Sequence, residues 1–129
     1  MKCRQKILIV DDEPINLDYL EMMLAKNGFT VEDACDGVEA LEKVKSFMPD
    51  VILLDNLMPK MSGNEVVKIL KDNPKYMSIP IIICSALDDI RDKEEGFKLG
   101  IMDYITKPFQ FREVLERIKN VLKDNGSVI

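Results

Sequence analysis

Histidine and tryptophan are both absent from this chain of 129 residues. Without histidine, the chain cannot build a Ser-His-Asp or Cys-His catalytic site, or a zinc site that contains histidine. The three cysteines, Cys3, Cys35 and Cys84, are odd in number and widely spaced, which indicates reduced thiols rather than a disulfide framework. Any chemistry is therefore expected from carboxylates, lysine, hydroxyl groups, the backbone and a hard cation.

Long apolar runs and a positive net charge are also lacking. The apolar runs are far shorter than the ~20 residues that span a bilayer, so we expect no membrane partner. The run at residues 7–10 is too short for a signal-peptide core and meets acidic residues at once, which favours a cytoplasmic location. The formal net charge of −5 disfavours a nucleic-acid-binding surface, and no nucleic-acid partner is expected.

The composition is typical of an ordered globular domain, with 47% hydrophobic and 32% charged residues and few Gly and Pro. A chain of 129 residues is long enough for one domain with one core. We expect a single domain over residues 1–129, with its core in about 5–123 and a polar tail at 124–129.

Five strand-like segments alternate with five segments of helical periodicity. The strand-like segments comprise residues 6–10, 30–34, 51–55, 79–84 and 103–106, and the helical ones comprise residues 14–27, 38–47, 64–73, 88–99 and 110–123. This alternation predicts an α/β fold with right-handed crossovers. We expect a doubly wound five-stranded parallel sheet, (βα)5, in the flavodoxin-like order 2-1-3-4-5, which places the polar second strand and the short fifth strand at the edges.

Turn and capping residues set several of the predicted boundaries. Gly28 is expected to end the first helix, and the Asp-Gly pair at residues 36–37 to form a turn. Asn64 is expected to cap the third helix, and Asp88 or Asp89 the fourth.

The first helix carries two apolar stripes. Three leucines at helical spacing form one of them, and Ile15, Tyr19 and Met22 form the other on the opposite side. A helix that is apolar on two sides is either buried between neighbouring elements or offers one side to a partner, and the sequence leaves both interpretations open.

Polar side chains follow the ends of four predicted strands. Asp11 and Asp12 follow the first strand, Asp55 ends the third, Ser85 follows the fourth and Lys107 follows the fifth. In the predicted strand order these ends meet at one edge of the sheet, where ligands bind in open α/β folds. Taken one at a time, each has a simpler interpretation: helix capping for the acid pair, turn capping for the serine, and a solvated charge for the lysine.

Three carboxylates at one edge repel one another unless a cation or a proton joins them. Carboxylate oxygens with access to solvent suit Mg²⁺, which usually takes one or two carboxylates together with phosphate. Lys107 and Ser85 would then contact phosphate oxygens. A carboxylate is the group that is left to attack phosphorus, which predicts an aspartyl phosphate and makes Asp55 the candidate nucleophile.

Four motifs support a resemblance to a known family. They are ILIVDDEP at 7–14, ILLDNLMPKMSG at 52–63, IIICSA at 81–86 and DYITKPF at 103–109. With these motifs the chain resembles the response-regulator receiver domains of bacterial two-component signalling, and in particular the stand-alone, chemotaxis-regulator-like receivers, over about residues 5–123.

The resemblance implies that Asp55 accepts phosphate from a phosphohistidine on a histidine kinase or a histidine phosphotransfer protein. It implies that Asp11 and Asp12 hold Mg²⁺ together with Asp55 and the backbone carbonyl of Leu57. A receiver of this kind acts on its own phosphorylation and dephosphorylation only and is otherwise not an enzyme. Its output would be a downstream protein that the sequence does not identify.

The resemblance also assigns roles outside the acid cluster. Ser85 and Lys107 would contact the phosphoryl group, Tyr104 would be the aromatic switch residue, and the Lys107–Pro108 bond would be cis. We expect phosphorylation to be read at the face formed by the fourth helix, Tyr104 and the last helix. The candidate docking residues for the phosphate donor are Ile15, Tyr19, Met22 and Pro108.

Several positions depart from the commoner family pattern. Asn56 stands at a position that is often apolar, and residues 101–102 replace a more usual small residue. Leu57 and Leu87 stand at two variable positions beside the phosphoryl site, where leucine cannot orient a water molecule. We therefore predict slow self-dephosphorylation, unless both leucines fold away from the site.

Three alternatives are weighed against this prediction. A phosphatase of the haloacid dehalogenase type would need a second Asp two residues after the nucleophile, where this chain has Leu57. A flavin-binding module would need a hydroxyl-rich loop after the first strand, where acidic residues would repel the phosphate. The third alternative is a receiver domain that belongs to a longer multidomain regulator.

Overall fold

The structure, a computed structural model, describes residues 4–58, 60–86 and 90–123. Five parallel strands form one sheet in the order β2-β1-β3-β4-β5, and a helix follows each strand, which confirms the predicted α/β fold and strand order. The strands are β1 (Lys6–Val10), β2 (Thr30–Ala34), β3 (Val51–Asp55), β4 (Ile81–Ala86) and β5 (Asp103–Lys107). The helices are α1 (Pro14–Lys26), α2 (Gly37–Phe47), α3 (Gly63–Lys71), α4 (Ile90–Leu99) and α5 (Phe111–Leu122).

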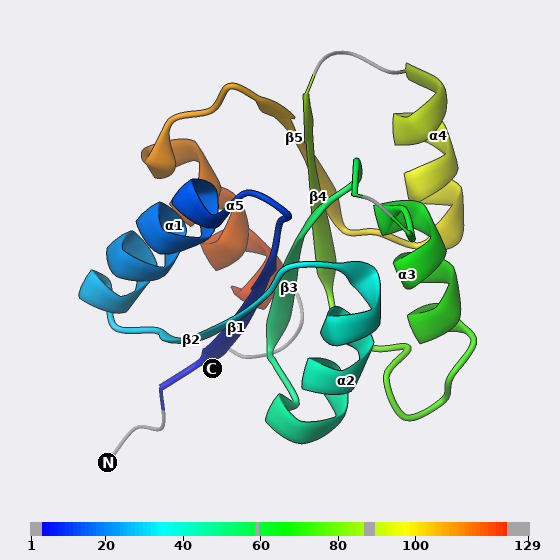
Figure 1. Cartoon of the computed structure of the whole chain (residues 1–129), viewed down its shortest axis with the longest axis horizontal. Helices are drawn as coiled ribbons and strands as arrows, with labels where there is room; N and C mark the ends of the chain where they lie inside the picture. Colours follow the sequence, from blue (N-terminus) through cyan, green and yellow to red (C-terminus); the bar gives the residue numbers. More distant parts are fainter. Residues whose placement is uncertain (1–3, 59, 87–89, 124–129) are drawn as a thin grey trace.

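Helices cover both faces of the sheet, with α1 and α5 on one side and α2, α3 and α4 on the other (Figure 1). Each side has its own apolar cluster. The leucine stripe of α1 packs with α5 in one cluster, and α2 and α3 pack in the other. All five residues of β3 are buried, as expected for a central strand of a parallel sheet covered on both faces.

Strand register brings the carboxyl ends of the strands together. Val10 of β1 pairs with Leu54, one residue before Asp55, and Asp55 pairs with Cys84 of β4. Ala86 of β4 pairs with Lys107. The polar residues that follow these strands therefore meet at one edge of the sheet, as predicted.

Two predicted helix starts are corrected by the structure. Ser62 caps α3 in place of Asn64: the Ser62 side chain accepts from the amide of Glu65, and Glu65 reaches back to the amide of Ser62. Asp36 likewise caps α2 by accepting from the amide of Glu39 at 2.8 Å, so the predicted Asp-Gly turn is the start of this helix. Only α3 has the reciprocal capping box, because the Glu39 side chain of α2 accepts from the amide of Cys35 and not from that of Asp36.

The fourth strand lies two residues further along the chain than predicted. It begins at Ile81 because Pro80 has no N–H to donate to a neighbouring strand, and it continues through Ser85, which pairs with Thr106. Gly28 ends α1 with a φ of 92°, as predicted. The predicted caps Asp88 and Asp89 lie outside the described residues.

Cys35 and Cys84 are free thiols, as predicted, and Cys3 lies outside the described residues. None of the helices in the described part of the chain combines the length and the apolar character needed to cross a membrane.

Candidate functional site

Asp11 and Asp12 lie in the short connection between β1 and α1. The backbone N–H of Asp11 donates to the carbonyl of Ala34, and its Oδ1 accepts from the amide of Glu13 at 3.0 Å. Asp11 is 4% exposed, whereas Asp12 is exposed. Glu13 occupies the cap position of α1, so neither aspartate is the capping residue that the simpler interpretation required.

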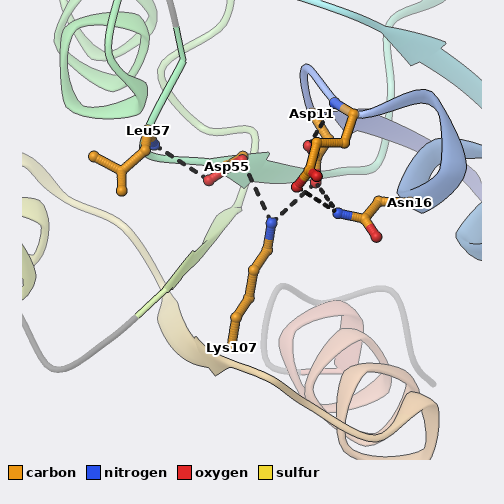
Figure 2. A network of polar contacts seen from close by, with 6 residues as sticks. Asp11, Asn16, Asp55, Leu57 and Lys107 are labelled. Carbon is orange, nitrogen blue, oxygen red and sulfur yellow. Dashed lines mark hydrogen bonds and ion pairs between the residues drawn. The ribbon is translucent and has the colours of Figure 1, made fainter.

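Asp55 ends β3 and is 6% exposed. Its Oδ1 accepts from the backbone N–H of Leu57 at 3.2 Å, which fixes the orientation of the carboxyl group (Figure 2). Burial raises the pKa of Asp55 above its ordinary value, and the nearby charge of Asp11 adds to this rise, while the charge of Lys107 opposes it. The buried carboxylate is therefore stabilised by positive charge.

Lys107 supplies that charge from the end of β5. Its Nζ lies 3.1 Å from Oδ2 of Asp11 and 3.4 Å from Oδ2 of Asp55, so one ammonium group bridges two carboxylates (Figure 2). Burial disfavours a charge on Lys107, but the two carboxylates outweigh burial and raise the pKa of Lys107 above its ordinary value. Lys107 is therefore a fixed ammonium group and not a solvated strand-end charge.

Asp11, Asp12 and Asp55 together form a group of oxygen donors. One carboxylate oxygen from each lies within 4.8 Å of the others. Two of the three residues are buried, while Asp12 faces solvent. A hard oxygen set that is open on one side fits Mg²⁺, which keeps several of its waters. These carboxylate oxygens are therefore of the type and at the edge of the sheet that the sequence predicted for Mg²⁺.

Asn16 contributes to the site and was not identified from the sequence. Its Nδ2 donates to Oδ2 of Asp11 at 3.3 Å and to Oε1 of Glu13 at 3.2 Å (Figure 2). Asn16 therefore holds Asp11 from the first turn of α1, on the side opposite Lys107. The available signal was its position, because a residue three places after Glu13 on a helix shares the same face.

Ser85 and Tyr104 lie on adjacent strands and on the same face of the sheet. Ser85 is 1% exposed, and it lies one residue beyond Cys84, which pairs with Asp55. Tyr104 pairs with Ile83, two residues before Ser85, so the period of two along a strand puts both side chains on one face. Tyr104 lies on the edge strand β5 but is only 5% exposed, and it packs in the apolar cluster that also contains residues of α2 and α3.

The second stripe of α1 is exposed. Ile15, Tyr19 and Met22 are 81%, 44% and 49% exposed. Tyr19 contacts the ring of Phe111 on α5 edge-on, with 6.4 Å between ring centroids. Pro108 is also exposed, and the Lys107–Pro108 bond is cis, as predicted. The stripe is therefore not buried between neighbouring elements, and its role as a docking face for a partner stays a prediction.

Leu57 is 60% exposed, so its side chain does not fold into the core. Leu87, the second leucine predicted to rim the site, lies outside the described residues.

Comparison with known proteins identifies the family. A family model described as the response regulator receiver domain matches residues 7–119. The chain is 43% identical over 119 residues to the alkaline phosphatase synthesis transcriptional regulatory protein PhoP of Bacillus subtilis, covering 92% of this chain and 49% of that protein. It is 36% identical over 118 residues to the DNA-binding dual master transcriptional regulator RpaA of Synechocystis, with 92% and 49% covered. The chain thus spans about half the length of these curated relatives.

Solved structures agree with this match. The Vibrio cholerae chemotaxis protein CheY4 superposes with a TM-score of 0.87 and 33% identity, over 92% of this chain and 99% of that one. The signal receiver domain of a signal transduction histidine kinase from Syntrophus aciditrophicus gives a TM-score of 0.87 and 32% identity, over 97% and 95%.

Members of this family generally are phosphorylated, bind Mg²⁺ and have a histidine kinase as partner, and they are not enzymes beyond their own phosphorylation. The fold, the acid cluster and the bridging lysine described above carry the features expected of that chemistry. Because the family model matches most of the chain, the chain belongs to the response regulator receiver domain family of two-component signalling.

Proposed function

We propose that Asp55 is the phosphoacceptor of this receiver domain. The observation that carries the proposal is the bridge from Lys107 to both Asp55 and Asp11 beside the exposed Asp12. It gives one buried carboxylate a fixed orientation, a fixed positive charge and a neighbouring set of hard oxygen donors. A phosphatase of the haloacid dehalogenase type is disfavoured because the position of its general acid is occupied by Leu57.

In the proposed transfer, a carboxylate oxygen of Asp55 forms a bond to phosphorus as the bond from phosphorus to the donor histidine nitrogen breaks. The electron pair of the broken bond stays with that nitrogen. These 129 residues contain no histidine, so the phosphohistidine lies outside this receiver domain. Lys107 keeps its proton throughout and stabilises the negative charge that gathers on the phosphoryl oxygens. Ser85, at the end of β4, is the candidate donor to one of these oxygens.

Mg²⁺ would be held by Asp11, Asp12, Asp55 and the backbone carbonyl of Leu57, and when bound it would neutralise phosphoryl charge. The support for this site is that the protein holds two of the carboxyl groups in place by its own contacts. Asn16 and Lys107 hold the carboxyl group of Asp11 from two sides, and the Leu57 amide holds that of Asp55.

The exposed stripe of α1 is the proposed docking face for the phosphate donor. Ile15, Tyr19 and Met22 lie on the helix that starts directly after the acid pair, and Pro108 directly follows Lys107. A partner that covers these residues would present its histidine close to Asp55. The proposed partner is therefore a histidine kinase or a histidine phosphotransfer protein.

Two settings for this receiver are consistent with its site. It acts as a single domain over residues 1–129 that switches or relays a signal, or it is the receiver part of a longer regulator. The second is favoured by relatives that are named as transcriptional regulators and are about twice as long as the matched region. In either setting we assign the receiver itself no nucleic-acid or membrane surface, and we place it in the cytoplasm.

The test is the intact mass of the protein after incubation with acetyl phosphate, with and without Mg²⁺. We expect one phosphoryl group to be gained only when Mg²⁺ is present. No gain under either condition would overturn the proposed function.

A further inference from the structure

Four backbone N–H groups at the start of a helix have no partner within the helix. In α3 all four are satisfied, in two pairs. The capping box of Ser62 and Glu65 satisfies the amides of those two residues. The other two amides are satisfied by Asn56, which lies next to the acceptor: its backbone carbonyl accepts from the amide of Gly63 at 3.0 Å, and its Oδ1 accepts from the amide of Asn64 at 3.0 Å.

Asn56 is 3% exposed, so its amide group is buried. Burying an amide is costly unless it is hydrogen-bonded, and the bond to Asn64 offsets that cost. The backbone N–H of Asn56 also donates to the carbonyl of Cys84 at 3.1 Å, which extends the pairing of β3 with β4 past Asp55. Asn56 is thus fixed to β4 on one side and to α3 on the other.

The start of α3 is packed closely against the end of β3. A Cβ at Gly63 would lie 2.8 Å from the carbonyl oxygen of Asp55 and 2.8 Å from Cα of Asn56. The first turn of α3 therefore rests directly on the backbone of the acceptor. Leu57 and Met58 directly follow Asn56 and begin the acceptor loop, which leads toward α3.

We propose that Asn56 is a positioning residue for the acceptor loop. By holding α3 against residues 55–56, its side chain fixes Leu57, whose N–H binds the carboxyl group of Asp55 and whose carbonyl is a candidate Mg²⁺ ligand. The inference rests on the proposed function. The Asn56 side chain binds the amide of Asn64 at the start of α3 and acts on the site through Leu57.

The test compares variants that remove one side-chain acceptor from the same helix end. Asn56→Ala removes the link to the acceptor strand, and Ser62→Ala is the matched control, because it removes a cap from within the loop. Asn56→Leu removes the acceptor but keeps a side chain of similar size, which separates the hydrogen bond from a cavity. Two readouts are measured in each protein by NMR: the Mg²⁺ dissociation constant, and the exchange rate of the Leu57 amide without Mg²⁺.

We expect both Asn56 variants to bind Mg²⁺ at least about tenfold more weakly than wild type, the size typical of losing a partner that orients a metal ligand. The Leu57 amide should exchange faster in both. Ser62→Ala should change the exchange of the Glu65 amide and leave Mg²⁺ binding as in wild type.

Equal Mg²⁺ affinity in wild type and the Asn56 variants would overturn the inference, and so would equal weakening in Ser62→Ala. Failure of both Asn56 variants to fold would overturn it as well, because Asn56 would then serve folding rather than the loop. If wild type itself binds no Mg²⁺, the proposed function fails instead.

Discussion

Lys107 and Asp55 form an ion pair across a strand that lies between them. Nζ of Lys107, at the end of β5, is 3.4 Å from Oδ2 of Asp55, at the end of β3, and β4 separates the two strands in the sheet. The lysine side chain reaches over the end of β4, where Ser85 is buried. The pair therefore closes the site on one side and leaves the side of Asp12 open to solvent.

The first prediction concerns the acceptor itself. Asp55→Asn keeps the shape of the side chain and removes the nucleophile, so phosphoryl uptake from acetyl phosphate should be lost. Uptake is measured by intact mass or by radiolabel. The fold should survive, because the amide oxygen can still accept from Leu57, and circular dichroism checks this. Labelling of the variant at the wild-type rate would show that another residue is the acceptor.

The second prediction concerns the clustered acids. Asp11, Asp12 and Asp55 repel one another in the metal-free protein, and bound Mg²⁺ should stabilise the folded state. The melting temperature should therefore rise with Mg²⁺ in wild type and rise less in Asp12→Ala.

Asp12→Ala should also melt at a higher temperature than wild type without Mg²⁺, because it removes repulsion. Glu42→Ala is a suitable control, since it removes an exposed acid of α2 that is outside the cluster. Equal Mg²⁺-dependent rises in wild type and Asp12→Ala would exclude Asp12 from the metal site.

The third prediction separates docking from chemistry. Tyr19→Ala should slow phosphoryl transfer from a histidine-phosphorylated donor protein and leave transfer from acetyl phosphate unchanged, because only a protein donor needs the α1 face. Loss of a well-packed interface aromatic typically costs about 2 kcal/mol, or roughly thirtyfold in affinity. The control is Ile69→Ala, which removes a similarly exposed apolar side chain from α3, on the other side of the sheet. A comparable slowing in the control, or slower labelling by acetyl phosphate in Tyr19→Ala, would contradict the docking assignment.

The sequence predicted some element boundaries correctly and others not, depending on the interaction that sets each boundary. β3 was predicted with its correct ends because four apolar residues followed by an aspartate define a buried strand and its end. β4 starts two residues later than predicted, because Pro80 has no N–H to donate to a neighbouring strand. α3 starts at the Ser62 cap and not at Asn64, and the sequence carries the signal for this start, because Ser62 and Glu65 have the spacing of a capping box.

The candidate site was predicted where it depended on strand ends and missed where it depended on local tertiary geometry. Strand order alone brings Asp11, Asp55 and Lys107 together, so their proximity follows from the topology. Asn16 and Asn56 act through single hydrogen bonds whose partners are set by how helices rest on the sheet. The spacing of Asn16 from Glu13 places both on one face but does not identify Asp11 as a partner, and no comparable signal points to Asn56.

The fourth prediction concerns the switch. Ser85 and Tyr104 share one face of the sheet, and Lys93 of α4 places its Nζ 5.8 Å from the centre of the Tyr104 ring. If Ser85 moves toward the phosphoryl group, the space beside Tyr104 changes in one state only, which is the differential contact that a switch requires. Ser85→Ala should still accept phosphate but show a smaller change in Tyr104 signals, followed by NMR or tyrosine fluorescence. A full-sized change in that variant would remove Ser85 from the switch.

The fifth prediction concerns the lifetime of the phosphorylated state. Hydrolysis needs a water in line with the bond from phosphorus to Asp55, and a side chain that hydrogen-bonds this water helps to hold it there. Leu57 is two residues from Asp55 and 60% exposed, so it lies at the rim and offers no such bond. The phosphorylated protein should decay slowly. Leu57→Asn should decay faster, by up to about tenfold, which corresponds to about 1.4 kcal/mol of barrier.

Leu57→Met is the matched control for this measurement, because it keeps an apolar side chain of similar size and should decay like wild type. Decay is followed by intact mass after the phosphodonor is removed. Because the amide of Leu57 binds Asp55 through the backbone, both variants keep that contact, and a difference between them reports the side chain alone. If Leu57→Asn decays at the wild-type rate, or if Leu57→Met decays just as fast as Leu57→Asn, the polarity of this side chain does not set the lifetime.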